Sequence, residues 1–179
     1  AFAAPHFIDM VCANRDITEN VKSTLDLSLN DVSRQIFCGH LSRLEPQRVF
    51  NGSLVVIDNE TANVIALVGS RDYFEPQSGQ VNGAISPRSA GSAFKPFTYL
   101  LALEKGMTPA TVLADVPTEF ATDTGLFSPV NYDRRYRGPI SFRDSLANSL
   151  NVPAVRVLDY VGGASVLQES LRRMGLSTL

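Results

Sequence analysis

A serine and a lysine three residues apart, Ser92 and Lys95, are the residues of this sequence best suited to nucleophilic chemistry. On a helix, residues with this spacing share a face, so the lysine nitrogen can reach the serine oxygen. A serine needs a partner that takes its proton, and a lysine can do so only when it is neutral. Because an unperturbed lysine has a pKa of about 10.4, this role needs burial or a helix N-terminus, both of which lower the pKa. The pair predicts an acyl-transfer site; the alternative is that Ser92 only caps a helix and Lys95 is solvated.

A second polar pair, Ser149 and Asn151, lies where a predicted helix ends before Pro153. Such a helix end can project polar groups into a cleft, but the same residues are also ordinary helix caps. The same letters, Ser-Leu-Asn, occur at residues 28–30, so the pattern by itself does not separate a site from a cap.

The elements that position these residues are predicted from the hydrophobic pattern and from proline and glycine. Two β-branched-rich runs, 53–58 and 63–68, predict a strand pair that is covered on both faces. A helix is expected from Ser92 to Lys105, because Pro96 is tolerated only in a first turn, which places Ser92 at or beside the N-cap. The expected apolar face of that helix contains Phe94, Phe97, Leu100, Leu101 and Leu103.

Other helices are expected on the basis of capping residues and glycine stops. They run from a cap at residues 23–26 to Gly39, from Ser141 to near Asn151, from Ala154 to Val161, and from Ala164 to Met174. Residues 107–139, with four prolines, are expected to be irregular. Strands come early and helices late, which indicates the α+β class.

Composition excludes several classes of function. The 179 residues carry a net charge of −2, whereas a nucleic-acid-binding protein needs a basic excess. No apolar run approaches the roughly 20 residues of a membrane-spanning helix, and the start at Ala1 indicates a processed or excised piece of a longer protein.

Cys12 and Cys38 are expected to be two buried thiols, with one bridge as the alternative, and His6 and His40 form no metal or base motif. No metal or cofactor is predicted.

Longer segments resemble a known family. Residues 88–97, RSAGSAFKPF, resemble the active-site motif of penicillin-binding proteins, and residues 145–155, SLANSLNVPAV, resemble their second motif region. Segments 113–117, 131–133 and 137–139 resemble the bifunctional class A enzymes, and segments 5–7 and 23–26 resemble the stretch that joins the glycosyltransferase and transpeptidase domains of that class. The similarity spans nearly the whole chain, with the motifs in family order.

The resemblance implies a fold and a domain organisation. The expected fold is α+β, the first part of a serine β-lactamase/D,D-peptidase-like domain, in which helices flank an antiparallel sheet. Residues 1–45 would be a linker segment, and residues 46–179 the N-terminal part of the penicillin-binding transpeptidase domain. The family's third motif, Lys-Thr-Gly, is absent from the sequence, so the later strands are expected to be missing from this chain and one sheet edge to be open.

The resemblance also implies residue roles and partners. Ser92 would attack the D-Ala–D-Ala bond of a peptidoglycan stem peptide, Lys95 would activate Ser92, and Ser149 and Asn151 would relay protons and hold the substrate amide. β-Lactam antibiotics would acylate Ser92, and cell-wall synthesis proteins are expected partners, on the periplasmic face of the bacterial inner membrane. The alternatives are a D,D-carboxypeptidase or β-lactamase-like hydrolase that uses the same residues, and a non-catalytic docking domain.

A basic and aromatic run in the loop before residue 138 has two interpretations. It is either a surface for anionic cell-wall groups or a solvated loop, and it comprises Tyr132, Arg134, Arg135, Tyr136 and Arg137.

Overall fold

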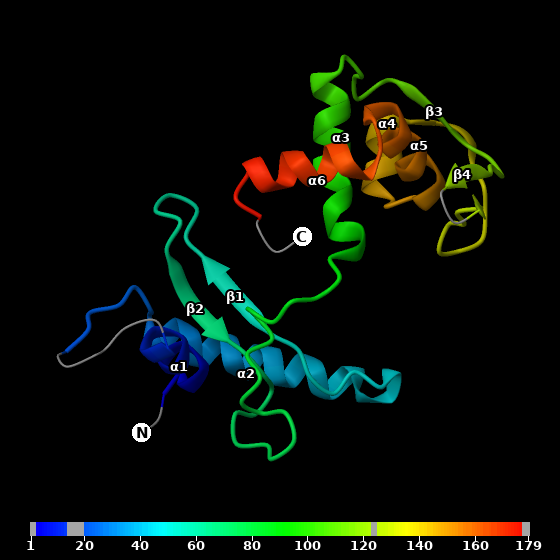
Figure 1. The fold of residues 1–179 in the computed structure, drawn as a ribbon. Coiled ribbons are helices and arrows are strands. Elements are labelled where there is room, and N and C mark those ends of the chain that lie inside the picture. Colours follow the sequence, from blue (N-terminus) through cyan, green and yellow to red (C-terminus); the bar gives the residue numbers. More distant parts are fainter. Residues whose placement is uncertain (1–2, 14–19, 123–124, 177–179) are drawn as a thin grey trace. The chain divides into compact units, whose positions relative to one another are not determined.

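The computed structural model describes residues 3–13, 20–122 and 125–176. The chain divides into two compact units, Ala1–Pro87 and Arg88–Leu179 (Figure 1). The first unit contains α1 (Pro5–Ala13), α2 (Leu27–Leu44), a 3₁₀ turn η1 (Glu45–Gln47), β1 (Leu54–Ile57) and β2 (Val64–Val68). The second contains a 3₁₀ turn η2 (Gly91–Phe94), α3 (Lys95–Glu104), β3 (Val112–Asp115), β4 (Phe120–Thr122), β5 (Gly125–Phe127), β6 (Gly138–Ser141), α4 (Phe142–Ala147), α5 (Asn151–Val161) and α6 (Ala164–Arg173).

Helix α2 is the long helix of the first unit, and it confirms the predicted cap. The Asp26 carboxylate accepts a hydrogen bond from the Leu29 amide at 2.9 Å. The predicted end at Gly39 is wrong, because the helix continues to Leu44. A glycine costs a helix interior only about 0.5–1 kcal/mol, which does not end a helix that packs against a sheet. The nine-residue helix α1, which begins at Pro5, was not predicted.

The predicted strand pair is confirmed as the antiparallel hairpin β1–β2, in which Val55 lies opposite Leu67. Helix α2 covers β2, and its Asn30 Oδ1 accepts a hydrogen bond from the Leu67 amide at 2.8 Å. The prediction that both faces are covered is wrong for β1, since Val55 and Ile57 are 40% and 55% exposed.

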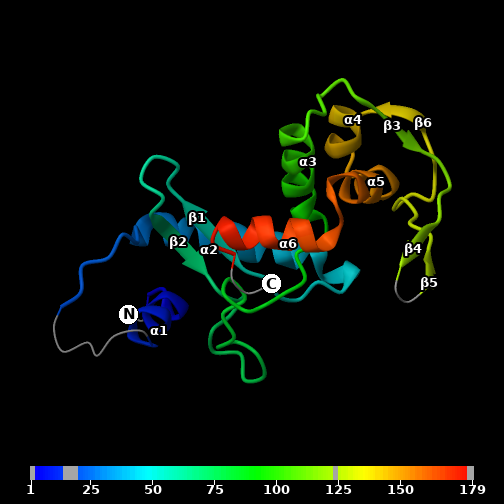
Figure 2. The same cartoon turned by 45° about the horizontal axis from the view of Figure 1, so that its top comes forward.

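The second unit has a hydrophobic core between its helices and the sheet β3–β6. The buried residues come from α3, β3, α4 and α5 and are Tyr99, Leu101, Ala102, Leu113, Phe142, Ala154, Val157 and Val161. The rings of Tyr99 and Phe142 meet edge to face with centroids 4.5 Å apart. The Tyr99 hydroxyl shares a 2.6 Å hydrogen bond with Oγ of the fully buried Ser145. Figure 2 shows α3, α4 and α5 beside the β3–β6 pair. Their packing positions the residues of the candidate site.

The buried face of α3 differs from the predicted one. Its buried residues are Thr98, Tyr99, Leu101 and Ala102, whereas Leu100 and Leu103 are each 40% exposed. Packing against α4 and α5 selects the face that carries Tyr99, because its ring meets Phe142 and its hydroxyl bonds Ser145, both on α4.

The prediction that residues 107–139 are irregular is wrong, because they contribute to four short strands. These strands form two antiparallel pairs, β3 with β6 and β4 with β5. The strands could not be predicted, because three or four residues are too few to show a two-residue period. Pro139 is compatible with β6, because this strand pairs on one side only and a proline is tolerated in an edge strand.

The end of the next helix was also predicted wrongly. Helix α4 begins at the predicted cap Ser141, whose hydroxyl accepts from the Asp144 amide, but it ends at Ala147. Helix α5 begins at Asn151 with Pro153 in its first turn, so this proline marks a start and not a stop. The predicted ends of the last two helices are confirmed, by the left-handed cap Gly162 and by the end of α6 at Arg173.

The result is the predicted mixed α+β fold. Among the helices of the described residues, none has the length and apolar character needed to cross a membrane.

Candidate active site

Lys95 lies at the centre of the candidate site as the first residue of α3. Its Nζ donates hydrogen bonds to the Ser149 carbonyl at 2.5 Å, to the Ser149 hydroxyl at 3.1 Å and to Oδ1 of Asn151 at 2.7 Å. These partners lie more than 50 residues further along the chain. The fold thus brings together three of the four predicted site residues by direct contact.

Ser149 reaches Lys95 because of the way α4 ends. The Ser149 amide donates to the Leu146 carbonyl at 2.9 Å and the Leu150 amide donates to the Ser145 carbonyl at 3.1 Å. This pair of bonds is the Schellman motif, whose left-handed position is usually glycine. Here the position is Ser149 with φ 51°, a conformation that L side chains rarely adopt. The left-handed turn presents both oxygens of Ser149 to the lysine.

Asn151 is placed by the start of α5, of which it is the first residue. Its side-chain amide has both ends bonded, since Oδ1 accepts from Lys95 and Nδ2 donates to the Val130 carbonyl at 2.8 Å. Its backbone amide donates to Oδ1 of Asn131 at 2.8 Å. The asparagine is thus fixed at three atoms.

Ser92 lies in the 3₁₀ turn η2, one turn before Lys95, and its side chain is exposed. The prediction that Ser92 lies at or beside the N-cap of this helix is wrong, because α3 begins at Lys95 and the cap positions are Ala90 for η2 and Phe94 for α3. The Ser92 carbonyl accepts a hydrogen bond from the Lys95 amide. In the described part of the chain, Nζ of Lys95 bonds to Ser149 and Asn151 and not to Ser92 Oγ. The serine hydroxyl is left accessible, on the turn that leads directly into the lysine.

Burial lowers the pKa of Lys95 below its ordinary value. The ammonium form donates to all three oxygens, whereas a neutral amine would donate two hydrogen bonds and accept one. The Ser149 hydroxyl can rotate to supply that bond, since a hydroxyl is both donor and acceptor. The site can therefore hold either protonation state, which a base requires.

A cavity of about 500 Å³ opens beside these groups, within the second unit. Lys95 and Asn151 supply polar groups to its wall, and the rest is largely apolar, with Phe94, Phe127, Val130 and Leu158 among the lining residues. A pocket with few polar groups in an apolar wall is typical of a site for a small ligand or a peptide.

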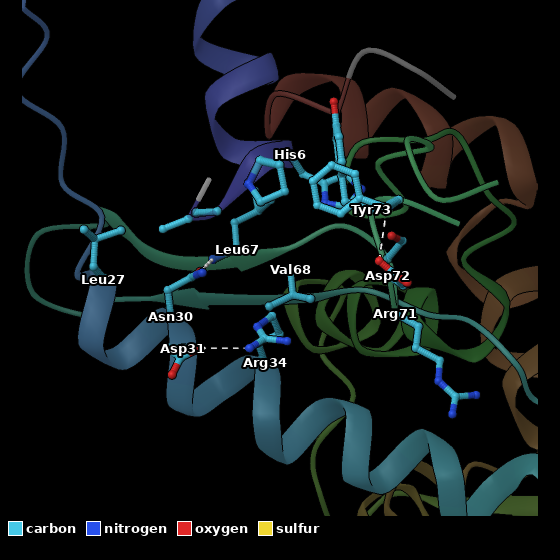
Figure 3. Close-up of a pocket in the computed structure, with 15 residues that line it drawn as sticks. His6, Leu27, Asn30, Asp31, Arg34, Leu67, Val68, Arg71, Asp72 and Tyr73 are labelled. Carbon is cyan, nitrogen blue, oxygen red and sulfur yellow. Dashed lines mark hydrogen bonds and ion pairs between the residues drawn. The ribbon is translucent and has the colours of Figure 1, made fainter. Parts of the chain in front are cut away.

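The first unit contains a separate cavity of about 290 Å³ between α1, α2 and β2 (Figure 3). Three of its charged residues are in ion pairs, Arg34 with Asp31 at 3.0 Å and Arg71 with Glu45. His6 is buried there and hydrogen-bonds the Gly79 carbonyl at 2.8 Å. None of the four predicted site residues lines this cavity.

Other predictions concern residues outside the candidate site. Across the described ranges, no group of three His, Cys, Asp or Glu side chains could hold a metal ion. The two cysteines are free, and the expectation that both are buried is wrong, because Cys12 is exposed and Cys38 is half-buried. In the basic run, Tyr132 is fully exposed, while Arg137 pairs with Asp133 at 2.9 Å and approaches Asp115 at 4.0 Å.

Two residues behind the site received no role from the sequence. Asp115 is 0% exposed and Asn131 2% exposed, and they hydrogen-bond each other. Each lies in a segment that resembles the class A family, which was the signal that singled them out, but their contact joins residues 16 positions apart and needs the fold.

Comparisons with known proteins agree with this fold. A family model described as the penicillin-binding protein transpeptidase domain matches residues 52–179. Penicillin-binding protein 1C of Escherichia coli (strain K12) is 35% identical over 97% of this chain and 22% of its own length. The crystal structure of penicillin-binding protein 1A from Haemophilus influenzae matches with TM-score 0.64 and 33% identity over 71% of this chain and 19% of that chain. Penicillin-binding protein A of M. tuberculosis, as its penicillin G acyl-enzyme complex, matches in fold with TM-score 0.69 and 22% identity over 97% of this chain and 44% of that chain.

Fold and family therefore agree on the class: an α+β protein of the transpeptidase type, with homologues among the bifunctional class A penicillin-binding proteins. The chain belongs to the penicillin-binding protein transpeptidase family. It spans about a fifth of the length of the curated relative 1C.

Proposed function

We propose that this chain carries the acylation half of a peptidoglycan D,D-transpeptidase site, with Ser92 as nucleophile and Lys95 as its base. The observation that carries the proposal is the convergence of Ser149 and Asn151 on Nζ of Lys95, one turn after the exposed Ser92, beside a cavity. The fold similarity to a protein solved as a penicillin G acyl-enzyme supports it.

In the proposed reaction, Ser92 Oγ attacks the carbonyl carbon of the penultimate D-alanine of a stem peptide. Its proton passes to neutral Lys95 and then, through the Ser149 hydroxyl, to the nitrogen of the leaving D-alanine. The C–N bond breaks as the Ser92 ester forms. An amine of a second stem peptide then attacks the ester carbonyl, and its proton passes through Lys95 to Ser92 Oγ as the C–O bond breaks. This step releases Ser92 and completes the cross-link. Asn151 holds the lysine through Oδ1, and its Nδ2 offers to the substrate the second N–H, the one that does not bond Val130.

A β-lactam would follow the first half of this path, because ring opening leaves the amine attached and the ester on Ser92 persists. We propose stem peptides and β-lactams as ligands and the extracytoplasmic face of the inner membrane as the location. The domain division at residue 46 and docking to cell-wall synthesis proteins are proposed on the same family grounds.

The test is covalent labelling with a fluorescent penicillin, read by intact mass, on protein that contains all of residues 1–179 and any sequence that naturally flanks them. We expect one adduct on the unchanged protein, none on Ser92→Ala, and unchanged labelling of the control Ser89→Ala, an exposed serine three residues upstream.

The outcomes separate the alternatives. Labelling that persists in Ser92→Ala contradicts the assignment of the nucleophile, and a folded unchanged protein that takes no label favours a docking role. An adduct that water removes within minutes identifies a hydrolase in place of a transpeptidase.

A further inference from the structure

Asp115 and Asn131 form a buried polar pair behind the candidate site, in the core of the second unit. The Asp115 side chain is the last of β3 and has no exposed surface, and Asn131 is almost as deeply buried. A carboxylate in an apolar surrounding is strongly destabilising unless every oxygen has partners. The hydrogen-bond partners of Asp115 must therefore offset the cost of burying its carboxylate.

The carboxylate is occupied by donors that fix one orientation of the Asn131 amide. Nδ2 of Asn131 lies 2.8 and 3.0 Å from the two carboxylate oxygens, and the Arg137 backbone amide donates to Oδ2 at 3.0 Å. Nδ2 also donates to the Arg135 carbonyl at 2.8 Å. Because every acceptor around Asn131 faces Nδ2, its Oδ1 must point the other way.

That oxygen caps helix α5. Oδ1 of Asn131 accepts hydrogen bonds from the amides of Asn151 at 2.8 Å and Val152 at 3.3 Å. These are the first two residues of α5, whose own N-cap residue, Leu150, supplies no side-chain hydrogen bond. The first amides of a helix have no partner within the helix, so a side chain from 20 residues upstream does the capping.

The cap leads directly to the lysine. Asn151, held at its amide by Asn131 and at its side chain by the Val130 carbonyl, presents Oδ1 to Nζ of Lys95 at 2.7 Å. We infer that Asp115 and Asn131 are positioning residues of the acyl-transfer site: Asp115 orients Asn131, and Asn131 sets the start of α5 so that Asn151 meets the lysine. This inference rests on the proposed function for the role of Lys95, but not for the cap itself.

The central variant is Asn131→Ala, with Asn148→Ala as its control. Asn148 is also an asparagine whose side chain donates one hydrogen bond to a backbone carbonyl, that of Asp144 at 2.8 Å, but this side chain is exposed and makes no hydrogen bond to Lys95, Ser149 or Asn151. Asp115→Asn is the conservative variant, which keeps the shape and removes the charge that orients Asn131.

Two readouts are measured below the melting temperature of every variant. The first is hydrogen exchange of the Asn151 and Val152 amides, which needs no activity; we expect about fivefold faster exchange in Asn131→Ala, since the lost cap is worth about 1 kcal/mol and about 1.4 kcal/mol corresponds to tenfold. The second is the rate of penicillin labelling against pH. A displaced Asn151 should slow labelling about 10- to 100-fold and move the midpoint of its pH profile, with a smaller effect in Asp115→Asn.

The control Asn148→Ala should change neither readout by more than about twofold. Unchanged exchange in Asn131→Ala overturns the cap. Faster exchange with an unchanged labelling rate and pH midpoint shows a purely structural pair and overturns the positioning role. If the unchanged protein takes no label, the proposed function fails, and an NMR titration of Lys95 in the same variants decides the positioning role instead: an unchanged titration overturns it.

Discussion

The two sides of the candidate site each contain one residue with left-handed backbone, but the residue types differ. On the nucleophile side it is Gly91, with φ 52°, directly before Ser92. On the lysine side it is Ser149, with φ 51°. Glycine adopts this conformation without strain, whereas an L residue there costs roughly 1–2 kcal/mol.

The difference follows from what each turn must hold. The Ser92 turn presents one exposed hydroxyl and is held by backbone hydrogen bonds, such as the 3.0 Å bond from Ala93 to Ala90. The Ser149 turn must supply a hydroxyl and a carbonyl oxygen to one amine, so a glycine there would lose half of the contact. Backbone strain that persists in a folded protein commonly marks a functional position, and here it coincides with the lysine contact.

The largest expected effect comes from breaking the lysine side at its centre. Lys95→Met should slow penicillin labelling by about 10²–10⁴, the usual contribution of a general base. The control is Lys105→Met, since Lys105 also donates from Nζ to a backbone carbonyl, that of Val161 at 2.7 Å, but lies at the other end of α3. Equal labelling of the two variants would contradict the base role.

The same variant tests the pH dependence. In the unchanged protein, labelling should accelerate as pH rises through the lowered pKa of Lys95, because only the neutral amine accepts the serine proton. Between that pKa and the ordinary value of about 10.4, the unfolded chain binds more protons than the folded one, so the free energy of unfolding rises with pH in this window. Lys95→Met should remove both slopes.

A smaller effect is expected from adding strain on the nucleophile side. Gly91→Ala meets no atom within 4 Å, so its cost is conformational, about 1–2 kcal/mol of the free energy of unfolding. Gly39→Ala is the matched opposite: the site is equally open but lies within helix α2, so this change should stabilise the protein by about 0.5–1 kcal/mol. Denaturant titration measures both, and the same sign for the two changes would refute the conformational argument.

How far the sequence predicts this molecule depends on the range of the interaction. Local signals were sufficient for the cap Asp26, the hairpin β1–β2 and the left-handed stop Gly162, because each depends on neighbouring residues. They failed where the outcome depends on packing, as for Gly39 inside α2 and for the buried face of α3.

The site shows the same division. The four candidate residues were identified from spacing and family resemblance, but spacing predicted that Lys95 reaches Ser92, whereas the described bonds of its nitrogen go to Ser149 and Asn151. The buried pair Asp115 and Asn131 could not be assigned, because its role depends on β3 and the start of α5 meeting in space.

The effect of Ser149 on stability is expected to be small, and it comes from relieving the strain of its left-handed backbone. Ser149→Gly should raise the free energy of unfolding by about 1 kcal/mol, because glycine removes the left-handed strain, although its greater freedom in the unfolded chain offsets part of the gain. Ser149→Ala keeps the strain and should leave stability within about 0.5 kcal/mol. Both remove the hydroxyl but keep the carbonyl, so each should slow labelling by at least about tenfold, the value of one hydrogen bond, and further where the proton relay is lost. If Ser149→Gly is more stable and is labelled at the unchanged rate, the strained serine serves neither the fold nor the lysine. If it is more stable but is labelled more slowly, the strain is retained for the chemistry.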